Sequence, residues 1–303
     1  MRSALILRHS LDLPSHPAGN FDHGDVSLAN GQVFIANTAA GSVEVVDGEQ
    51  LRYLVTIPGC PEASGVLVAQ EEGQVFAAAR GAGQLLIIDP TTHTVLRTVP
   101  VGPRPNGLAW DPHRKHLLVA DVQQNRAHLV DPQRSKVTAQ VQLPGRPRWA
   151  VYHQGSGHFL VNIREPACVA ALSADPFALV ERFPISSPGP HGLDLDQTGR
   201  RAFVACDGGA VVTLDLASGR ELAQAPIAGP PDAIWHNHRL NRLYVAIPDP
   251  GVIEVVNTES MMVEEQIPTE VGAHTTAYDA RRQRLYVFLP SCRVAVYEES
   301  EVP

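Results

Sequence analysis

Long apolar runs and closely spaced cysteines are both missing from this sequence. No apolar run approaches the roughly 18–20 residues that a membrane-spanning helix needs. The apolar stretch from Ala4 to Leu7 is too short to form the core of a secretory signal peptide. The chain has 4 cysteines, none of them in a CxxC pair: Cys60, Cys168, Cys206 and Cys292. We therefore expect a cytoplasmic protein with reduced thiols, without a membrane span or a disulfide framework.

Charged residues are also few. They make up 18% of the chain, and the formal net charge at pH 7 is −8. An acidic protein has no overall positive field to attract nucleic acid or an anionic membrane, so we expect neither as a partner. A small-molecule ligand and a protein partner both remain open. The hydrophobic fraction of 44% is sufficient for a packed core.

What the sequence does contain is a repeat of about 42 residues. One set of equivalent positions in the seven repeats, which we call the first register, comes directly after apolar, β-rich runs such as VEVV and LLII. Its residues are Asp47, Asp89, Asp131, Ser173, Asp215, Asn257 and Glu298. A second register marks the start of each repeat: His23, Ser64, Asn106, Arg148, His191, Asp232 and His274. Repeats of this length with several short strands predict an all-β, seven-bladed β-propeller of four-stranded antiparallel blades. We expect one domain over residues 1–303.

Each repeat reads as short strands separated by turn residues. In the third repeat we expect strands at 106–110, 117–120, 126–130 and 136–143, with Gly, Pro, Asn and Asp between them. Helical periodicity is nearly absent, and only residues 175–182 are consistent with one helical turn. The recurring acids at the ends of the third strands, such as Asp47 and Asp89, are interpreted as turn-formers that bind local backbone amides.

The last repeat is incomplete, because three strands follow His274 before the chain ends. Residues 4–13, with the sequence ALILRHSLDL, match the missing outer strand. We therefore predict that the N-terminal strand completes blade seven beside residues 293–298. Such closure removes the unpaired edges that an open ring would leave.

Several segments resemble a known repeat family. RLYVAIPDPGVIEVVN, VFIANTAAGSVEVVD and LLVADVQQNRAHLVD are similar to the YVTN-type repeats of YncE-like propellers, and VGAHTTAYDARRQRLYVFLP is the most family-like stretch. The resemblance implies a seven-bladed propeller and carries no fixed reaction. A WD-repeat protein is disfavoured, since Trp110-Asp111 is the only WD pair and ends a first strand.

The innermost strands of a propeller line its central channel, so the second register should form a ring at one channel mouth. His191, Asp232, His274 and His23 belong to consecutive blades once the ring closes. Their nitrogen and oxygen donors suit a divalent transition metal such as Zn, Fe, Mn or Ni. Ser64, Asn106 and Arg148 complete the opposite arc, and Arg80 follows a second strand at the same mouth. No organic cofactor is indicated.

This ring permits several kinds of site. A metal could activate water or polarise a carbonyl while Arg148, Asn106, Ser64 and Arg80 hold an anionic or carbonyl group. Without metal, His191 or His274 could act as a general base and Arg148 as an electrostatic stabiliser. A purely structural polar ring is the third interpretation.

Residues beside the ring have two interpretations each. Asp22 and Glu62 are either partners that orient His23 or solvated loop acids. Cys60 and Cys206 lie near the same mouth and are interpreted as buried thiols rather than nucleophiles.

Two classes of function follow. The first is a metal-dependent hydrolase or lyase acting on a small carbonyl-bearing anion. The segment Pro190-His191-Gly192-Leu193 is similar to the strand entry of virginiamycin B lyase-type propellers, which implies a catalytic His191. The His-rich arc differs from the acidic ligand set of calcium lactonases. The second class is a YncE-like binding or interaction module without turnover.

Overall fold

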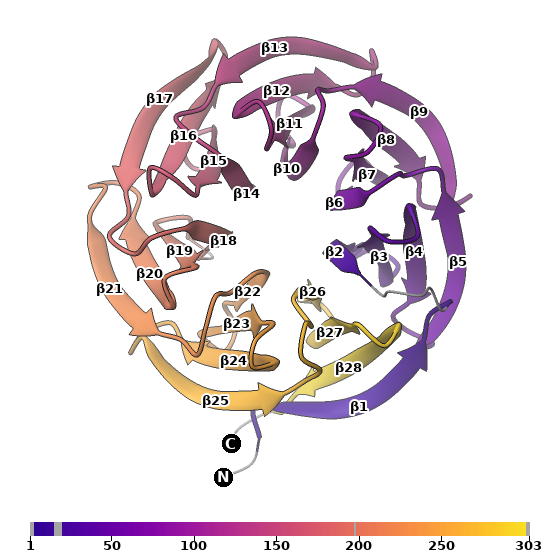
Figure 1. The fold of residues 1–303 in the computed structure, drawn as a ribbon, viewed down its shortest axis with the longest axis vertical. Helices are drawn as coiled ribbons and strands as arrows, with labels where there is room; N and C mark the ends of the chain where they lie inside the picture. The colour runs from indigo at the N-terminus through magenta and orange to yellow at the C-terminus, as the bar shows by residue number, and fades with distance from the viewer. Residues whose placement is uncertain (1–2, 15–19, 197, 301–303) are drawn as a thin grey trace.

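The computed structural model describes residues 3–14, 20–196 and 198–300. Their strands form seven four-stranded antiparallel sheets arranged as blades around a central channel (Figure 1). This arrangement confirms the predicted all-β, seven-bladed β-propeller. In the described part of the chain, no helix is long and apolar enough to cross a membrane.

The strands fall into four concentric sets. The innermost strands are β2 (Phe21–Val26), β6 (Ala63–Ala69), β10 (Pro105–Asp111), β14 (Pro147–His153), β18 (Pro190–Leu195), β22 (Ile234–Asn237) and β26 (Thr275–Asp279). The second set is β3 (Gln32–Asn37), β7 (Gln74–Ala79), β11 (His116–Asp121), β15 (His158–Ile163), β19 (Arg201–Cys206), β23 (Arg242–Ile247) and β27 (Arg284–Leu289). The third set is β4 (Ser42–Asp47), β8 (Gln84–Asp89), β12 (Arg126–Asp131), β16 (Cys168–Ala174), β20 (Ala210–Asp215), β24 (Val252–Asn257) and β28 (Arg293–Glu299). The outermost set is β5 (Arg52–Pro58), β9 (Thr94–Pro100), β13 (Lys136–Gln142), β17 (Phe177–Pro184), β21 (Glu221–Pro226), β25 (Met262–Pro268) and β1 (Leu5–Asp12).

The expected strands of the third repeat agree with β10 to β13 within about two residues, as boundary definitions allow. The suggested helical turn at 175–182 is wrong. Residues 177–184 form the outer strand β17, which pairs with β16 through residues such as Ala178 and Leu179. The pattern of polar and apolar residues in so short a segment is consistent with either a strand or one helical turn. Pairing with β16 makes this segment a strand.

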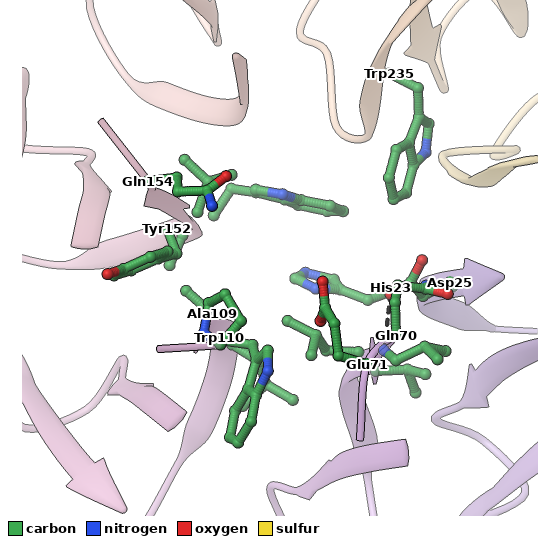
Figure 2. Close-up of a pocket in the computed structure, with 18 residues that line it drawn as sticks. His23, Asp25, Gln70, Glu71, Ala109, Trp110, Tyr152, Gln154 and Trp235 are labelled. Carbon is green, nitrogen blue, oxygen red and sulfur yellow. Dashed lines mark hydrogen bonds between the residues drawn. The ribbon is translucent and has the colours of Figure 1, made fainter. Parts of the chain in front are cut away.

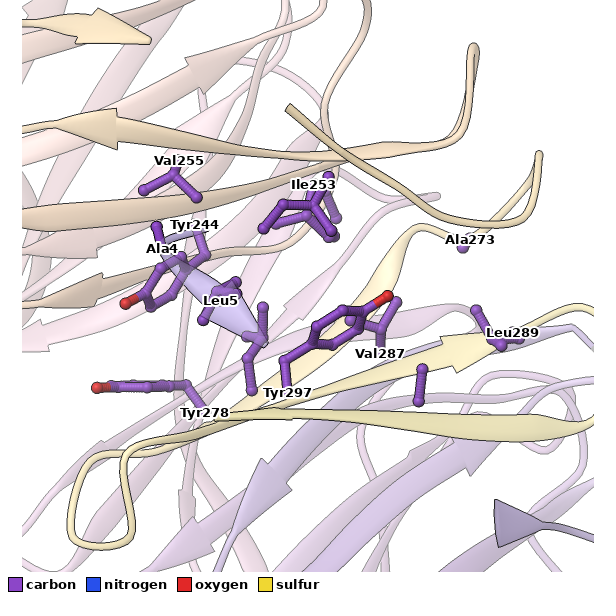
Figure 3. Close-up of a cluster of buried hydrophobic side chains, with 14 residues drawn as sticks. Ala4, Leu5, Tyr244, Ile253, Val255, Ala273, Tyr278, Val287, Leu289 and Tyr297 are labelled. Atoms are coloured by element: carbon purple, nitrogen blue, oxygen red, sulfur yellow. The ribbon is translucent and has the colours of Figure 1, made fainter. Parts of the chain in front are cut away.

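Burial follows the position of each strand in its blade. The middle strands are almost wholly buried, because both of their faces pack against neighbouring blades. The outer strand β13 instead alternates between exposed and half-buried residues. Figure 3 shows one interblade cluster, in which Tyr244, Ile253 and Val255 of blade six meet Leu5 and Val287 of blade seven. Each blade is thus held mainly by apolar contact with the next.

The N-terminal strand closes the ring. β1 pairs antiparallel with β28, in a register that runs from Leu5 opposite Glu299 to Asp12 opposite Arg293. Figure 1 shows β1 (violet) as the outer strand of the blade formed by β26, β27 and β28. The predicted closure by residues 4–13 is therefore confirmed.

The recurring acids are turn-formers, as predicted. Asp47 and Asp89 each accept hydrogen bonds from the backbone amides two and three positions further along the chain. Asp131 and Asp215 accept one from the amide three positions further along. These side chains therefore stabilise the turn into each outer strand and take no part in the channel site.

Candidate functional site

The innermost strands bring six of the seven predicted ring residues to one pocket at the channel mouth. The pocket has a volume of about 110 Å³, and its lining is mostly polar: Asp22, His23, Arg80, Asn106, Arg148, Trp149, His191, Asp232 and His274. All of the ring residues lie at or just before the start of an innermost strand, where the blades converge on the axis. The volume corresponds to a few water molecules at about 30 Å³ each, which is room for a small ligand.

Ser64, predicted as a ligand-binding residue, does not line this pocket. It is fully buried and donates a hydrogen bond to the Pro105 carbonyl at 2.9 Å, which ties blade two to blade three. Its short side chain reaches the neighbouring backbone instead of the channel.

Glycines after the ring residues let adjacent innermost strands approach one another. A Cβ at Gly107 would lie 2.3 Å from the Arg148 carbonyl oxygen, and one at Gly65 would lie 2.0 Å from that of Asn106. Each glycine thus packs directly against the backbone of the next ring residue. The repeat of glycine in this position is a requirement of close packing around the axis.

We expect Gly107→Ala to destabilise the protein by about 1–3 kcal/mol, because the added methyl group must displace the backbone that carries Arg148. Gly155→Ala is the control, since Gly155 is exposed and its Cβ would meet only the His153 side chain. Thermal unfolding of the two variants measures the difference. Equal melting temperatures for both would contradict the close-packing argument.

His191 is held between two carboxylates. Its Nδ1 lies 3.0 Å from Asp207 Oδ1, and its Nε2 lies 3.5 Å from Asp232 Oδ1. The Asn162 amide donates to the His191 carbonyl at 3.0 Å, which fixes the backbone from the second strand. A carboxylate on one ring nitrogen orients the imidazole and sets its tautomer, as for a general base.

Asp207 also pairs with Arg164 at 2.8 Å. Burial alone would raise the pKa of Asp207, but its hydrogen bond to His191 and the charge of Arg164 hold the pKa below its ordinary value. Asp207 is therefore ionised at neutral pH. Asp207 follows directly after β19, and this position at the end of a second strand places it at the channel mouth. Its pairing with His191 depends on the tertiary structure.

The other side of the pocket carries a second charged group. Asp22 Oδ2 accepts a hydrogen bond from Arg80 at 2.6 Å, and Asp22 Oδ1 lies 3.5 Å from His23 Nε2. Burial alone would raise the pKa of Asp22, yet His23 and Arg80 hold it below its ordinary value. Asp22 is thus the partner of both His23 and Arg80, whereas Glu62 forms an exposed pair with Arg104.

The pKa values of His23 and His274, which both interact with Asp22, are shifted in opposite directions. Burial lowers the pKa of His23, although Asp22 and Asp232 oppose this. Burial also acts to lower the pKa of His274, but Asp232, the Gly272 carbonyl and Asp22 together raise it. The Nδ1 atom of His274 lies 2.8 Å from the Gly272 oxygen, which favours a proton on that nitrogen.

Arg148 differs from the other cations of this mouth. Arg80 and Arg164 have carboxylate partners, whereas Arg148 forms no ion pair with any residue that the structure describes. Its Nε is buried and has no hydrogen-bond partner in the described structure. Burial, together with Arg146 and Arg164, lowers the pKa of Arg148. The carboxylates of Asp232 and Asp207 partly offset these effects, but neither forms an ion pair with Arg148 in the described structure. A half-buried guanidinium without a directly paired carboxylate is a candidate site for an anion.

The metal prediction rested on His23, His191, Asp232 and His274. All four line the pocket, but the described residues contain no group of three or more His, Cys, Asp or Glu side chains placed to hold a metal ion. The His23 ring is stacked on Trp149 at a centroid distance of 4.1 Å, and both ring nitrogens of His191 face carboxylates. The described residues therefore contain no preformed metal centre of three or more such side chains.

The cysteines near the mouth are inert in this structure. Cys60 and Cys206 are buried, and burial raises the pKa of each thiol to about 12. A neutral, buried thiol is a poor nucleophile.

Trp149 lines the pocket although the sequence pattern gave it no role. It follows Arg148 directly, so the only sequence signal was its adjacency to a ring position. Its stacking on His23 joins blade four to blade one across the channel, a contact between residues 126 positions apart that no repeat pattern specifies.

Fold and mouth together define a seven-bladed β-propeller with a polar pocket on its axis. The chain is similar to a solved structure described as Kuenenia stuttgartiensis hydrazine synthase, with a TM-score of 0.86 and 14% sequence identity. The match covers 95% of this chain and 97% of that chain, and at this identity it shows the fold alone. No protein-family model matches the chain, and no curated protein matches it.

Proposed function

We propose that the channel mouth binds a small anion bearing a carbonyl group and acts on it by general acid–base catalysis. The observation that carries this proposal is the Arg148 guanidinium, which lines the pocket without a carboxylate partner among the described residues. Asn106 lines the same pocket, and its Oδ1 is buried without a hydrogen-bond partner. Arg148 would bind the carboxylate of the ligand, and the Asn106 Nδ2 group would donate to its carbonyl oxygen. The unpaired Asn106 Oδ1 is an acceptor and would take a hydrogen bond from water or from a hydroxyl of the ligand.

The histidines supply the acid and the base. His191, oriented through Nδ1 by Asp207, would accept a proton at Nε2 from water or from the carbon next to the carbonyl. His274, whose pKa is raised, would donate a proton to the leaving atom. In the hydrolysis of a carboxylate-bearing ester, the water oxygen bonds to the ester carbonyl carbon and its proton passes to His191. The bond between that carbon and the ester oxygen then breaks, and the leaving oxygen takes a proton from His274.

The experiment is a calorimetric titration of purified protein with small 2-oxo acids such as pyruvate, beside the corresponding neutral alcohols. We expect saturable binding of the oxo acid and none of the alcohol. A parallel titration after treatment with a chelator, and another after adding zinc or manganese, tests the metal-assisted alternative. Binding that requires the added metal would overturn the acid–base scheme in favour of a metal centre at His191 and His274.

Anion affinity should depend on pH through His274. The raised pKa means that the imidazolium persists above the ordinary value of 6.5 and is lost as pH rises through the folded-state pKa. The charges facing it are Asp232 and Asp22, with Arg80 in the same pocket. We expect affinity for a small carboxylate to fall by about fivefold to tenfold as this positive charge disappears.

His274→Gln should remove that pH step while leaving the affinity at high pH unchanged. The contribution of protonated His274 to folding stability changes with pH in the same direction as the anion affinity. It is fully present below pH 6.5 and is lost as pH rises through the raised value. Titrations between pH 5.5 and 9 in wild type and variant measure the step. A pH step that survives in the variant would assign the titration to another group.

The alternative proposal is a YncE-like propeller that binds without turnover. The YVTN-like segments in several blades favour it, and so does the role of the same scaffold in many binding proteins. The two proposals share the anion site and differ only in chemistry. Tight binding of carboxylate-bearing esters with no hydrolysis, observed by NMR over hours, would favour the binding module.

A further inference from the structure

A second cavity lies further along the same innermost strands, beyond the polar mouth. It has a volume of about 380 Å³ and is lined by segments of β2, β6, β10 and β14. All 3 tryptophans of the chain line it: Trp110, Trp149 and Trp235. Figure 2 shows Trp235 and Trp110 on opposite sides of this cavity and Tyr152 on a third. A chain with 6% aromatic residues thus places its indoles around one space.

The charge of this aromatic cavity is negative. The described residues that line it include the carboxylates Asp25 and Glu71 and no lysine or arginine. His23 is the only other ionisable group besides Tyr152 in this lining, and burial lowers its pKa, so it is neutral at pH 7. Figure 2 shows Asp25 and Glu71 across the cavity from Tyr152.

Asp25 is a half-buried carboxylate whose hydrogen-bond partners in the described structure are all backbone amides. Its Oδ1 accepts from Val26 at 2.7 Å and its Oδ2 from Val68 at 2.8 Å. Burial raises the pKa of Asp25 to about 6, and no lysine or arginine is among the described residues that line the cavity. Glu71 is exposed and forms no hydrogen bond or ion pair among the described residues. A cationic ligand would supply the missing counter-charge for both.

Two of the aromatic rings that line the cavity lie at right angles to each other. Trp149 and Trp235 meet at an interplanar angle of 89° with ring centroids 6.2 Å apart, so that they form a corner. Trp149 and Trp235 each also pack against a cluster of buried apolar side chains, which holds the ring in place. Indole rings attract cations through their electron-rich faces, and walls of aromatic rings with carboxylates suit substituted ammonium ions.

We propose that this aromatic cavity binds a small organic ammonium ion. An anion would be repelled by Asp25 and Glu71, and a neutral apolar ligand would leave both carboxylates without a counter-ion. A hydrated metal ion would gain little from indole faces. His23 and Trp149 line both this cavity and the polar mouth, so they form a wall between the two sites. The proposal does not depend on what the polar mouth binds.

The test uses choline and its neutral isostere 3,3-dimethylbutan-1-ol, which have similar shape and differ in charge. Because all the tryptophans line the cavity, intrinsic fluorescence reports binding directly, and calorimetry gives the affinity. We expect choline to bind at least about tenfold more tightly than the alcohol. Equal affinities would define a plain apolar pocket and overturn the proposal, as would the absence of saturable choline binding at millimolar concentrations.

Glu71→Gln should weaken choline binding by about threefold to tenfold and leave binding of the alcohol unchanged. Glu72→Gln is the matched control, because Glu72 loses the same charge one residue away but pairs with Lys115 at 3.1 Å and does not line the cavity. Glu71 is exposed, so its variant should fold normally. Trp235→Leu should also weaken choline more than the alcohol. Equal effects of the two glutamate variants would overturn the proposal.

Discussion

Replacing Arg148 with methionine is expected to lower the affinity of the channel mouth for small carboxylates by about 100-fold, or about 2.7 kcal/mol. The guanidinium is half-buried and has no carboxylate partner in the described structure, so its interaction with a bound anion is not shared with the protein. Truncating one partner of a buried, hydrogen-bonded charge pair costs about 2–5 kcal/mol of binding free energy. Methionine keeps the apolar stem and removes only the charged end.

The same substitution should not destabilise the fold. Burial and the neighbouring Arg146 and Arg164 act against the charge of Arg148, as its lowered pKa indicates. Removing the charge relieves both effects, so the melting temperature should stay the same or rise. A residue retained at a cost in stability is typical of a binding site.

Arg146→Met is the control for this prediction. Arg146 is exposed, lies two residues away and does not line the pocket. We expect only a severalfold loss of carboxylate affinity through the weaker local field. Calorimetry on the two variants and the wild type measures all three affinities. Equal losses in the two variants would mean that the anion is held by the general positive charge of the loops and not by Arg148.

Deleting residues 1–12 is expected to abolish cooperative folding or to lower the melting temperature severely. The deletion removes β1, exposes the edge of β28 along its whole length and takes Leu5 and Leu11 out of the core. Burial of these two leucines alone contributes about 3–6 kcal/mol. That is a large fraction of the roughly 5–15 kcal/mol by which domains are usually stable.

A pair of point substitutions on the same strand refines this test. Leu11 is 6% exposed and packs in the cluster with Leu13 and Phe21, whereas Leu7 is 54% exposed. Leu11→Ala should cost about 2 kcal/mol or more of unfolding free energy, and Leu7→Ala less than about 0.5 kcal/mol. Denaturant unfolding of the two variants provides both values. Similar losses would show that β1 does not pack as the ring closure requires.

The blade pattern was predictable because it rests on local chemistry repeated along the chain. Turn acids such as Asp47, apolar runs such as LLII and the glycine after each of several ring positions all recur at the same spacing. A spacing of about 42 residues also placed His191, His274 and Arg148 at one mouth, since equivalent positions in a propeller face the same way. The outer strand β17 was misjudged in part because a single eight-residue segment carries too little periodic signal.

The sequence by itself therefore determined the seven blades, their strand order, the closure by the N-terminal strand and the residue types at the mouth. Only the tertiary structure decided which of those residues are partners: His191 with Asp207, Arg80 with Asp22, and Trp149 with His23 across the axis. It also left Arg148 without a counter-ion and gathered the three tryptophans around one cavity. The reason is that a repeat specifies the position of a residue within its blade, whereas contacts across the channel depend on side-chain length and direction between blades, which no periodicity encodes.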